Sequence, residues 1–114
     1  MANMRYEGWW EQEGWGRQPM RNLQLQFQAG SVTGSGADAI GPFTLRGSLQ
    51  EGRVRLLKQY LDRHSVEYSG HFDGEGVLAG AWHIGLSSGK WLIGLRGPRE
   101  GAADRAIENL DDVG

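Results

Sequence analysis

The sequence predicts an all-β fold: an antiparallel up-and-down β-barrel of about eight strands, followed by a short acidic C-terminal tail. Residues 22–28, Asn-Leu-Gln-Leu-Gln-Phe-Gln, alternate polar and apolar without a break, which is typical of a half-buried antiparallel strand. Turn signals recur about every 8–12 residues, and such short connections make neighbouring strands pair antiparallel. The 19 glycines among 114 residues disfavour helices, because each glycine costs about 1 kcal/mol inside one.

Each expected strand lies between two turn signals. Glycine-containing turns are predicted at 29–31, 51–52, 73–76 and 87–89. Eight strands with one apolar face each close most simply into a barrel, which removes the sheet edges and leaves room for side chains or one small ligand. Glycines inside the strands are expected to mark bends or close approaches. In chain order the expected strands are around 6–10, 22–28, around 32–33, 43–49, 53–60, 64–72, 77–84 and 90–96.

The apolar parity of each strand gives the expected core. Trp9 and Trp10 are neighbours in the chain, so on a strand one of them must face outward. The residues expected to be mostly buried are Leu23, Leu25, Phe27, Phe43, Leu45, Val54, Leu56, Val66, Leu78, Trp82, Ile84, Ile93 and Leu95.

The length predicts one barrel domain over residues 1–97, with a tail over 98–114 that is disordered or a short helix. Residues 1–99 carry 11 basic and 9 acidic side chains, and residues 100–114 carry one and five, so the net charges are +2 and −4. We expect residues 100–114 to be dispensable for folding. The alternative is that Ile107 and Leu110, which lie at helical spacing with Ala103 and Ala106, dock on the barrel.

Composition excludes several classes of protein. A nearly neutral body lacks the electrostatic footprint of a nucleic-acid binder. No run of 18 apolar residues exists, so no membrane span is expected. The chain has no cysteine and no export signal at its start, which favours a cytoplasmic, bacterial setting. No cofactor and no metal are expected, since the three histidines lack ligand spacing.

The densest group of polar and aromatic residues is Lys58, Tyr60, His64 and Tyr68, with Asp38 in the glycine-rich segment before them. Lys58 and Tyr60 share their parity with the apolar face of their strand, and His64 and Tyr68 share one face of the next. At a barrel mouth an ammonium and phenols could bind an anion or a carbonyl, while an imidazole transfers a proton. Trp82 and Trp91 would be the walls of such a site.

A structural role is the alternative for each of these residues. Lys58 can extend its ammonium to water at the rim, and His64 can cap a turn. Asp38 can accept backbone N–H bonds in a glycine-rich strand and turn. Trp82 and Trp91 can be ordinary core residues.

A longer pattern links these segments. It runs Val32-x-Gly34-x-Gly36-x-Asp38-x-x-Gly41-x-Phe43-x-Leu45-x-Gly47, then Lys58-x-Tyr60-x-x-x-His64-x-Val66-x-Tyr68-x-Gly70, then Leu78-x-Gly80-x-Trp82. It resembles a family of small, largely uncharacterised all-β domains of bacterial proteins, and in shape it is similar to the calycin and avidin class of eight-stranded barrels. That resemblance implies a lumen for a small apolar or aromatic molecule, and some members of the class are cyclases or isomerases. No biotin-site pattern is present, so the resemblance carries architecture and no activity.

Three functions follow. The first is a small-ligand binder that holds an apolar or aromatic molecule in the lumen, with Tyr68, Trp82, Trp91, Lys58 and His64 as ligand-binding residues. The second is a small enzyme of cyclase, isomerase or lyase type, with Lys58, Tyr60, His64 and Asp38 as catalytic candidates. The third is an assembly module with a filled interior and an apolar outer patch. The expected partner is a small molecule, not nucleic acid or membrane, and a homo-oligomer is left open.

Overall fold

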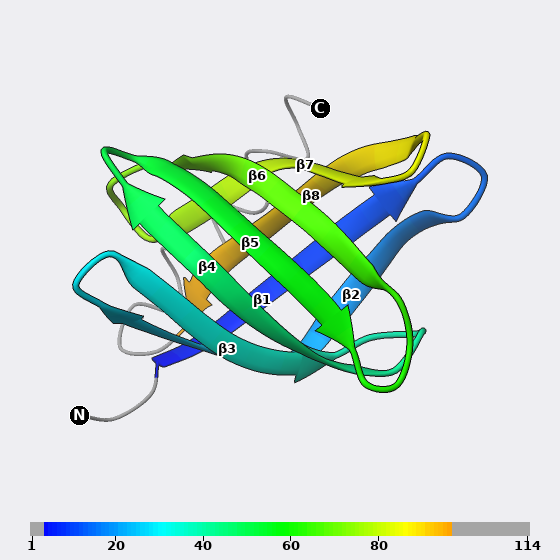
Figure 1. Ribbon diagram of the computed structural model, residues 1–114, viewed down its shortest axis with the longest axis horizontal. Coiled ribbons are helices and arrows are strands. Elements are labelled where there is room, and N and C mark those ends of the chain that lie inside the picture. The colour runs from blue at the N-terminus through cyan, green and yellow to red at the C-terminus, as the bar shows by residue number, and fades with distance from the viewer. Residues whose placement is uncertain (1–3, 97–114) are drawn as a thin grey trace.

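The computed structural model describes residues 4–96, which form a closed barrel of eight antiparallel strands (Figure 1). The fold class is therefore as predicted. No helix in the described part of the chain is long and apolar enough to cross a membrane. The strands are β1 (Met4–Gln12), β2 (Gly16–Gln28), β3 (Ser31–Ala37), β4 (Pro42–Gln50), β5 (Arg53–Tyr60), β6 (Ser65–Phe72), β7 (Val77–Ile84) and β8 (Ser87–Arg96).

Every strand pairs with its neighbours in the sequence, and β1 closes the barrel by pairing with β8. Across this seam Trp9 lies opposite Leu92, and Trp10 lies opposite Trp91. Trp10 points into the barrel and belongs to the main core, whereas Trp9 points outward into a separate cluster. The adjacent tryptophans thus face opposite sides, as their position on one strand requires.

Strand β2 is longer than the expected segment 22–28, because it begins at Gly16. Its pairing with both neighbours shifts register close to Asn22, which has a φ of 53°. Met20 and Leu23 are both buried, although one has an even residue number and the other an odd one. The irregularity therefore switches the parity of the strand, which explains why the alternation could not be followed upstream of residue 22.

The predicted core is largely confirmed, but the prediction that Phe27 and Ile84 are buried is wrong. Phe27 is 39% exposed and Ile84 is 36% exposed. Both keep the inward parity of their strands, but each lies at a strand end next to a hairpin, where the barrel opens. The side chain of Leu95 lies outside the described residues. The members found buried are Leu23, Leu25, Phe43, Leu45, Val54, Leu56, Val66, Leu78, Trp82 and Ile93.

Glycine allows two strands to approach very closely on one side of the barrel. Gly70 of β6 lies opposite Gly80 of β7. A Cβ added at Gly70 would lie 2.0 Å from the carbonyl oxygen of Ala79, and one at Gly80 would lie 1.9 Å from that of Ser69. Only glycine fits at these positions, as expected for a strongly coiled small barrel.

Candidate functional site

A carboxylate, an ammonium, two phenols and an indole meet inside the barrel, and the centre of this buried polar cluster is Asp38. Its Oδ2 accepts hydrogen bonds from Lys58 Nζ at 2.7 Å, from the Tyr60 hydroxyl at 2.7 Å and from Trp10 Nε1 at 3.0 Å. The side chains of Asp38 and Lys58 are 0% and 1% exposed, so the ion pair is shielded from water. Tyr68 completes the cluster by accepting a hydrogen bond from Lys58 Nζ at 3.1 Å.

The local structure after β3 places Asp38 inside the barrel. Its second oxygen, Oδ1, accepts the backbone N–H of Ile40 at 2.9 Å, and its own N–H donates to the carbonyl of Gly41. This is the turn geometry typical of Asp, and the predicted backbone-accepting role of Asp38 is confirmed. One carboxylate oxygen of Asp38 thus stabilises the turn after β3, and the other binds Lys58.

Lys58 lies on β5 and is surrounded by acceptors and aromatic rings. Besides Asp38 and Tyr68, its Nζ approaches the Met20 sulfur at 3.9 Å and lies 4.3 Å from the centre of the Phe43 ring. The ring faces of nearby aromatic residues attract a cation, more strongly when water is excluded. Lys58 therefore does not extend to water at the rim, and the structural alternative stated for it is wrong.

Burial and pairing shift the pKa values of the cluster in different directions. Burial lowers the pKa of Lys58 to about 8, although Asp38 opposes the shift. For Asp38, burial alone would raise the pKa, but the hydrogen bond and charge of Lys58, followed by the Tyr60 and Ile40 bonds, hold it below its usual value. Burial and Asp38 raise the pKa of Tyr60, and the same two causes raise that of Tyr68. Both phenols therefore keep their protons at neutral pH.

Release of the Lys58 proton is expected to raise the free energy of unfolding by about 2 kcal/mol between pH 8 and pH 10. Lys58 has a pKa of about 8 when folded and 10.5 ordinarily, so in this interval the unfolded chain holds a proton that the folded chain has released. Stability rises with pH wherever the unfolded state binds more protons. The trend reverses near pH 10, because Tyr60 and Tyr68, with an ordinary pKa of 10.0, ionise in the unfolded chain and keep their protons in the folded one.

Urea denaturation from pH 7 to pH 11 measures this effect, and Lys58→Met is the matched control. The variant has no lysine at the cluster, so its stability is expected not to rise between pH 8 and pH 10, and to fall slightly near pH 10 as Tyr60 and Tyr68 begin to ionise in the unfolded chain. A parent protein whose stability is flat or falls across that interval contradicts the assignment.

A cavity of about 80 Å³ lies against the cluster at one end of the barrel. Trp10, Tyr60 and Tyr68 of the cluster form its inner wall, and Trp82 forms another wall. His64 lines the mouth; it is exposed, and its ring lies 5.1 Å from that of Tyr60. The other lining residues are Gln12, Ile40, Val66, Ile84 and Ser87.

The structure thus brings together all the predicted site residues except Trp91 around one cavity and one buried cluster. Trp91 is 1% exposed and does not line the cavity. Its Nε1 donates to the carbonyl oxygens of Ser69 and Ala81, and its ring packs against that of Tyr68 with the two ring centres 5.1 Å apart.

Sequence reasoning missed Trp10 and Met20 as members of the cluster. The Trp9–Trp10 pair indicated that one indole faces inward, but no pattern pointed from β1 to Asp38. The register shift within β2 conceals the inward parity of Met20. Among the described residues, no group of three or more potential ligands could hold a metal ion.

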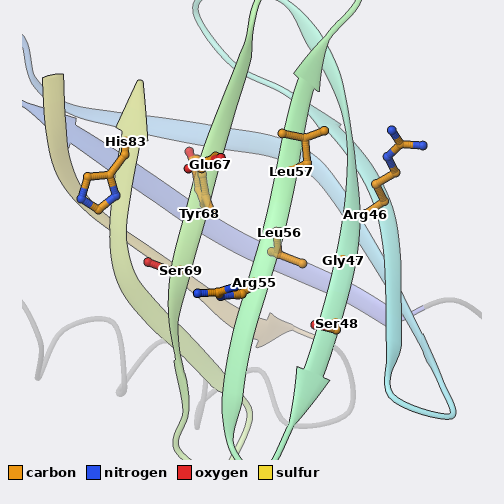
Figure 2. A pocket seen from close by; sticks show the side chains of 10 residues that line it. All are labelled: Arg46, Gly47, Ser48, Arg55, Leu56, Leu57, Glu67, Tyr68, Ser69 and His83. Atoms are coloured by element: carbon orange, nitrogen blue, oxygen red, sulfur yellow. The ribbon is translucent and has the colours of Figure 1, made fainter. Parts of the chain in front are cut away.

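A second, open groove of about 430 Å³ lies on the outer side of β4–β7 (Figure 2). Arg46 and His83 lie toward opposite sides of the view, with Arg55 and Glu67 between them. Neither arginine forms an ion pair with a described residue. The groove combines both charge signs on exposed side chains. The buried polar residue on its lining, Tyr68, has its hydroxyl bonded to Lys58 in the cluster inside the barrel, so the barrel mouth is the better candidate site.

No family model, no curated protein and no solved structure matched the chain. The resemblance drawn from the sequence is therefore confirmed in shape alone, as an eight-stranded antiparallel barrel. Fold and site together define a small closed β-barrel with a buried Lys–Asp ion pair beneath a narrow mouth.

Proposed function

We propose that this barrel binds a small molecule at the mouth that lies above the buried polar cluster. The ligand inserts a compact apolar or aromatic group that carries a hydrogen-bond acceptor such as a carbonyl. One observation carries the proposal: the Tyr68 hydroxyl accepts a bond from Lys58, but its own hydrogen has no acceptor among the described residues. Tyr68 also lines the cavity, so this hydrogen is available to a ligand.

The surroundings of Tyr68 make it a strong donor. A cation that donates to a phenol oxygen draws electron density from the O–H bond, and such chains of hydrogen bonds strengthen one another in a dry interior. The raised pKa keeps the proton on Tyr68 at neutral pH. A hydrogen-bond acceptor on the ligand therefore gains more here than from an exposed phenol.

The size of the cavity restricts the ligand. Ligand sites commonly measure about 300–1,000 Å³, whereas this cavity of about 80 Å³ has room for two or three waters at about 30 Å³ each. Only a small group can enter beside Trp10 and Trp82, whose rings pack edge to face with their centres 6.1 Å apart. The rest of a larger molecule would lie outside, against Ile84, Ser87 and His64 at the mouth.

The catalytic alternative has less support. Asp38 Oδ2 already accepts three hydrogen bonds, and the Tyr60 hydroxyl is the donor of one of them. His64 touches the Tyr60 ring, but no hydrogen bond joins its side chain to the cluster among the described residues. A proton-transfer site needs an acid and a base within hydrogen-bond reach of a substrate, and binding requires only the Tyr68 donor and the apolar walls.

Cyclopentanone and cyclopentane form a matched pair of probes, because they differ only in the carbonyl group. The ketone is expected to shift the indole N–H resonances of Trp10 and Trp82, and to bind more tightly than the hydrocarbon. Tyr68→Phe removes the donor and is expected to weaken ketone binding by about tenfold, since one buried hydrogen bond contributes about 1.4 kcal/mol. Binding of cyclopentane is expected to change little.

Tyr6→Phe is the control, because Tyr6 packs on Phe27 away from the mouth. Its ketone affinity is expected to equal that of the parent. Equal ketone affinity in Tyr68→Phe and the parent would remove the observation on which the proposal depends. A ketone that shifts no tryptophan resonance in the folded parent would reject the mouth as a carbonyl site.

A further inference from the structure

The most exposed large apolar side chains of the described residues lie at the end of the barrel that carries the mouth. In this up-and-down barrel the connections after β1, β3, β5 and β7 lie at one end, and residues in or next to them line the cavity. Leu86 is fully exposed, Leu61 is 65% exposed and Trp15 is 61% exposed, and each lies in one of these connections. Exposed apolar surface beside a cavity is typical of a binding site.

Trp15 continues the aromatic wall of the cavity outward. Trp10 and Trp82 both line the cavity and are buried. The Trp15 ring lies against the Trp10 ring, with the centres 6.4 Å apart and the planes tilted by 33°. Three indoles therefore lead from the buried wall of the cavity to an exposed ring at the rim.

The neighbouring hairpin adds an aliphatic surface. Ile84 lines the cavity and is 36% exposed, and Leu86 follows it at the tip of the β7–β8 hairpin. Because β1 pairs with β8, the β1–β2 and β7–β8 hairpins lie side by side (Figure 1). Trp15, Ile84 and Leu86 are called the rim strip below.

The part of the rim formed by the β5–β6 connection is less suited to an apolar molecule. Leu61 is followed there by Asp62, Arg63 and His64, all of them exposed. An apolar group that covers this segment would remove water from charged side chains, which is costly. The two connections of the rim strip contain one charged residue, Glu13. The rim strip is therefore the favourable route for an apolar group that leaves the cavity.

We propose that the ligand of the mouth is a carbonyl compound with a long apolar tail, and that the tail lies on the rim strip. This inference rests on the proposed function and specifies its ligand class. The carbonyl end enters the cavity of about 80 Å³ and accepts the hydrogen bond of Tyr68. The tail is too large to follow, so it lies against Trp15 and Leu86, where both surfaces lose their contact with water.

Two linear ketones, 2-pentanone and 2-nonanone, test the tail because they differ only by four methylene groups. Each methylene that is removed from water strengthens binding up to about fourfold. The rim strip covers a tail on one side, so we expect 2-nonanone to bind the parent protein about tenfold more tightly than 2-pentanone.

Tryptophan emission reports where the tail lies. All five tryptophans belong to the described part of the chain, and Trp15 is the exposed one among them. Iodide stays in water and therefore quenches Trp15 selectively. We expect 2-nonanone to reduce this quenching at least about twofold, because the tail covers the ring, and 2-pentanone to leave it nearly unchanged.

Trp15→Gln with Leu86→Gln removes the exposed apolar groups of the rim strip. This variant is expected to bind 2-nonanone about tenfold more weakly than the parent and to bind 2-pentanone equally well. Leu61→Gln is the matched control, because it makes the same change at an exposed leucine of the same end of the barrel. Its affinity for both ketones is expected to equal that of the parent. Leu86→Gln alone keeps the contact between Trp15 and Trp10, and it is expected to lose part of the tail contribution if the double variant does not fold.

Equal affinity of the parent for the two ketones overturns the inference and leaves the proposed function in place. A tail contribution that persists in the double variant, or that is lost in Leu61→Gln, also overturns it, because the tail then lies elsewhere. Failure of the proposed function gives a different result. In that case neither ketone binds more tightly than the alkane of the same length, and Tyr68→Phe changes neither affinity.

Discussion

Replacing Asp38 with alanine is expected to lower the free energy of unfolding by about 3–5 kcal/mol. The substitution leaves the Lys58 ammonium buried with a phenol and a thioether as its remaining hydrogen-bond partners. It also removes the acceptor of Tyr60 and Trp10. An uncompensated buried charge costs far more than an ion pair contributes, so the loss exceeds that of an ordinary surface acid.

A mutant cycle separates the charge pair from these other bonds. Asp38→Asn and Lys58→Met each leave one buried group without its partner, whereas the double variant removes both charges. The double variant is expected to be more stable than the sum of the two single losses predicts, by about 2 kcal/mol. Urea denaturation of the four proteins measures this coupling. Asp73→Ala, in an exposed turn, is the control and is expected to lose about 1 kcal/mol.

Two outcomes would contradict this account of the cluster. The first is a loss below about 1 kcal/mol for Asp38→Ala, which would mean that water reaches Lys58. The second is strict additivity in the cycle, which would mean that the ammonium and the carboxylate do not interact.

Gly70→Ala is expected to destabilise the barrel by about 3 kcal/mol, at the upper end of the cost of overpacking. The added Cβ would lie 2.0 Å from the carbonyl oxygen of Ala79 and 2.9 Å from the Cα of Gly80. Both neighbours are backbone atoms, so β6 and β7 must separate and weaken their hydrogen bonds. A flexible side chain could have moved aside at lower cost.

Gly74→Ala is the comparison, because a Cβ there meets nothing within 4 Å. Its φ of 82° still makes alanine unfavourable, at about 1 kcal/mol. Thermal or urea denaturation is expected to show a clearly larger loss for Gly70→Ala. Equal losses at the two positions would mean that backbone conformation, and not close approach of the strands, requires glycine at Gly70.

The sequence predicts the barrel well because period two reports directly on which face is buried. Leu23, Leu25 and Leu45 follow the rule, and all are buried. Parity does not report the position of a residue along the barrel axis, however. Phe27 and Ile84 therefore face inward as predicted but are not buried, because both lie near the end of a strand.

The site is predictable in part for the same reason. The parity of Lys58, Tyr60 and Tyr68 predicts that all three face inward. They lie on β5 and β6, which are consecutive strands, so antiparallel pairing of these strands brings them close together. The pairing of Asp38 with Lys58 depends on where a turn at the end of β3 directs one carboxylate, which no local pattern contains. Trp10 joins the cluster only because β1 closes the barrel against β8.

Closure of the barrel through β1 and β8 has a consequence for synthesis on the ribosome. The first strand to emerge has no partner on one side until the eighth strand is complete, so a nascent chain presents two open edges, on β1 and on the latest strand. Such edges recruit other chains, and closing the longest loop last slows folding. The nascent chain therefore stays prone to aggregation until β8 has been synthesised and Trp91 and Leu92 can pair with Trp10 and Trp9. A pause or truncation within β8 is expected to leave an open, aggregation-prone sheet.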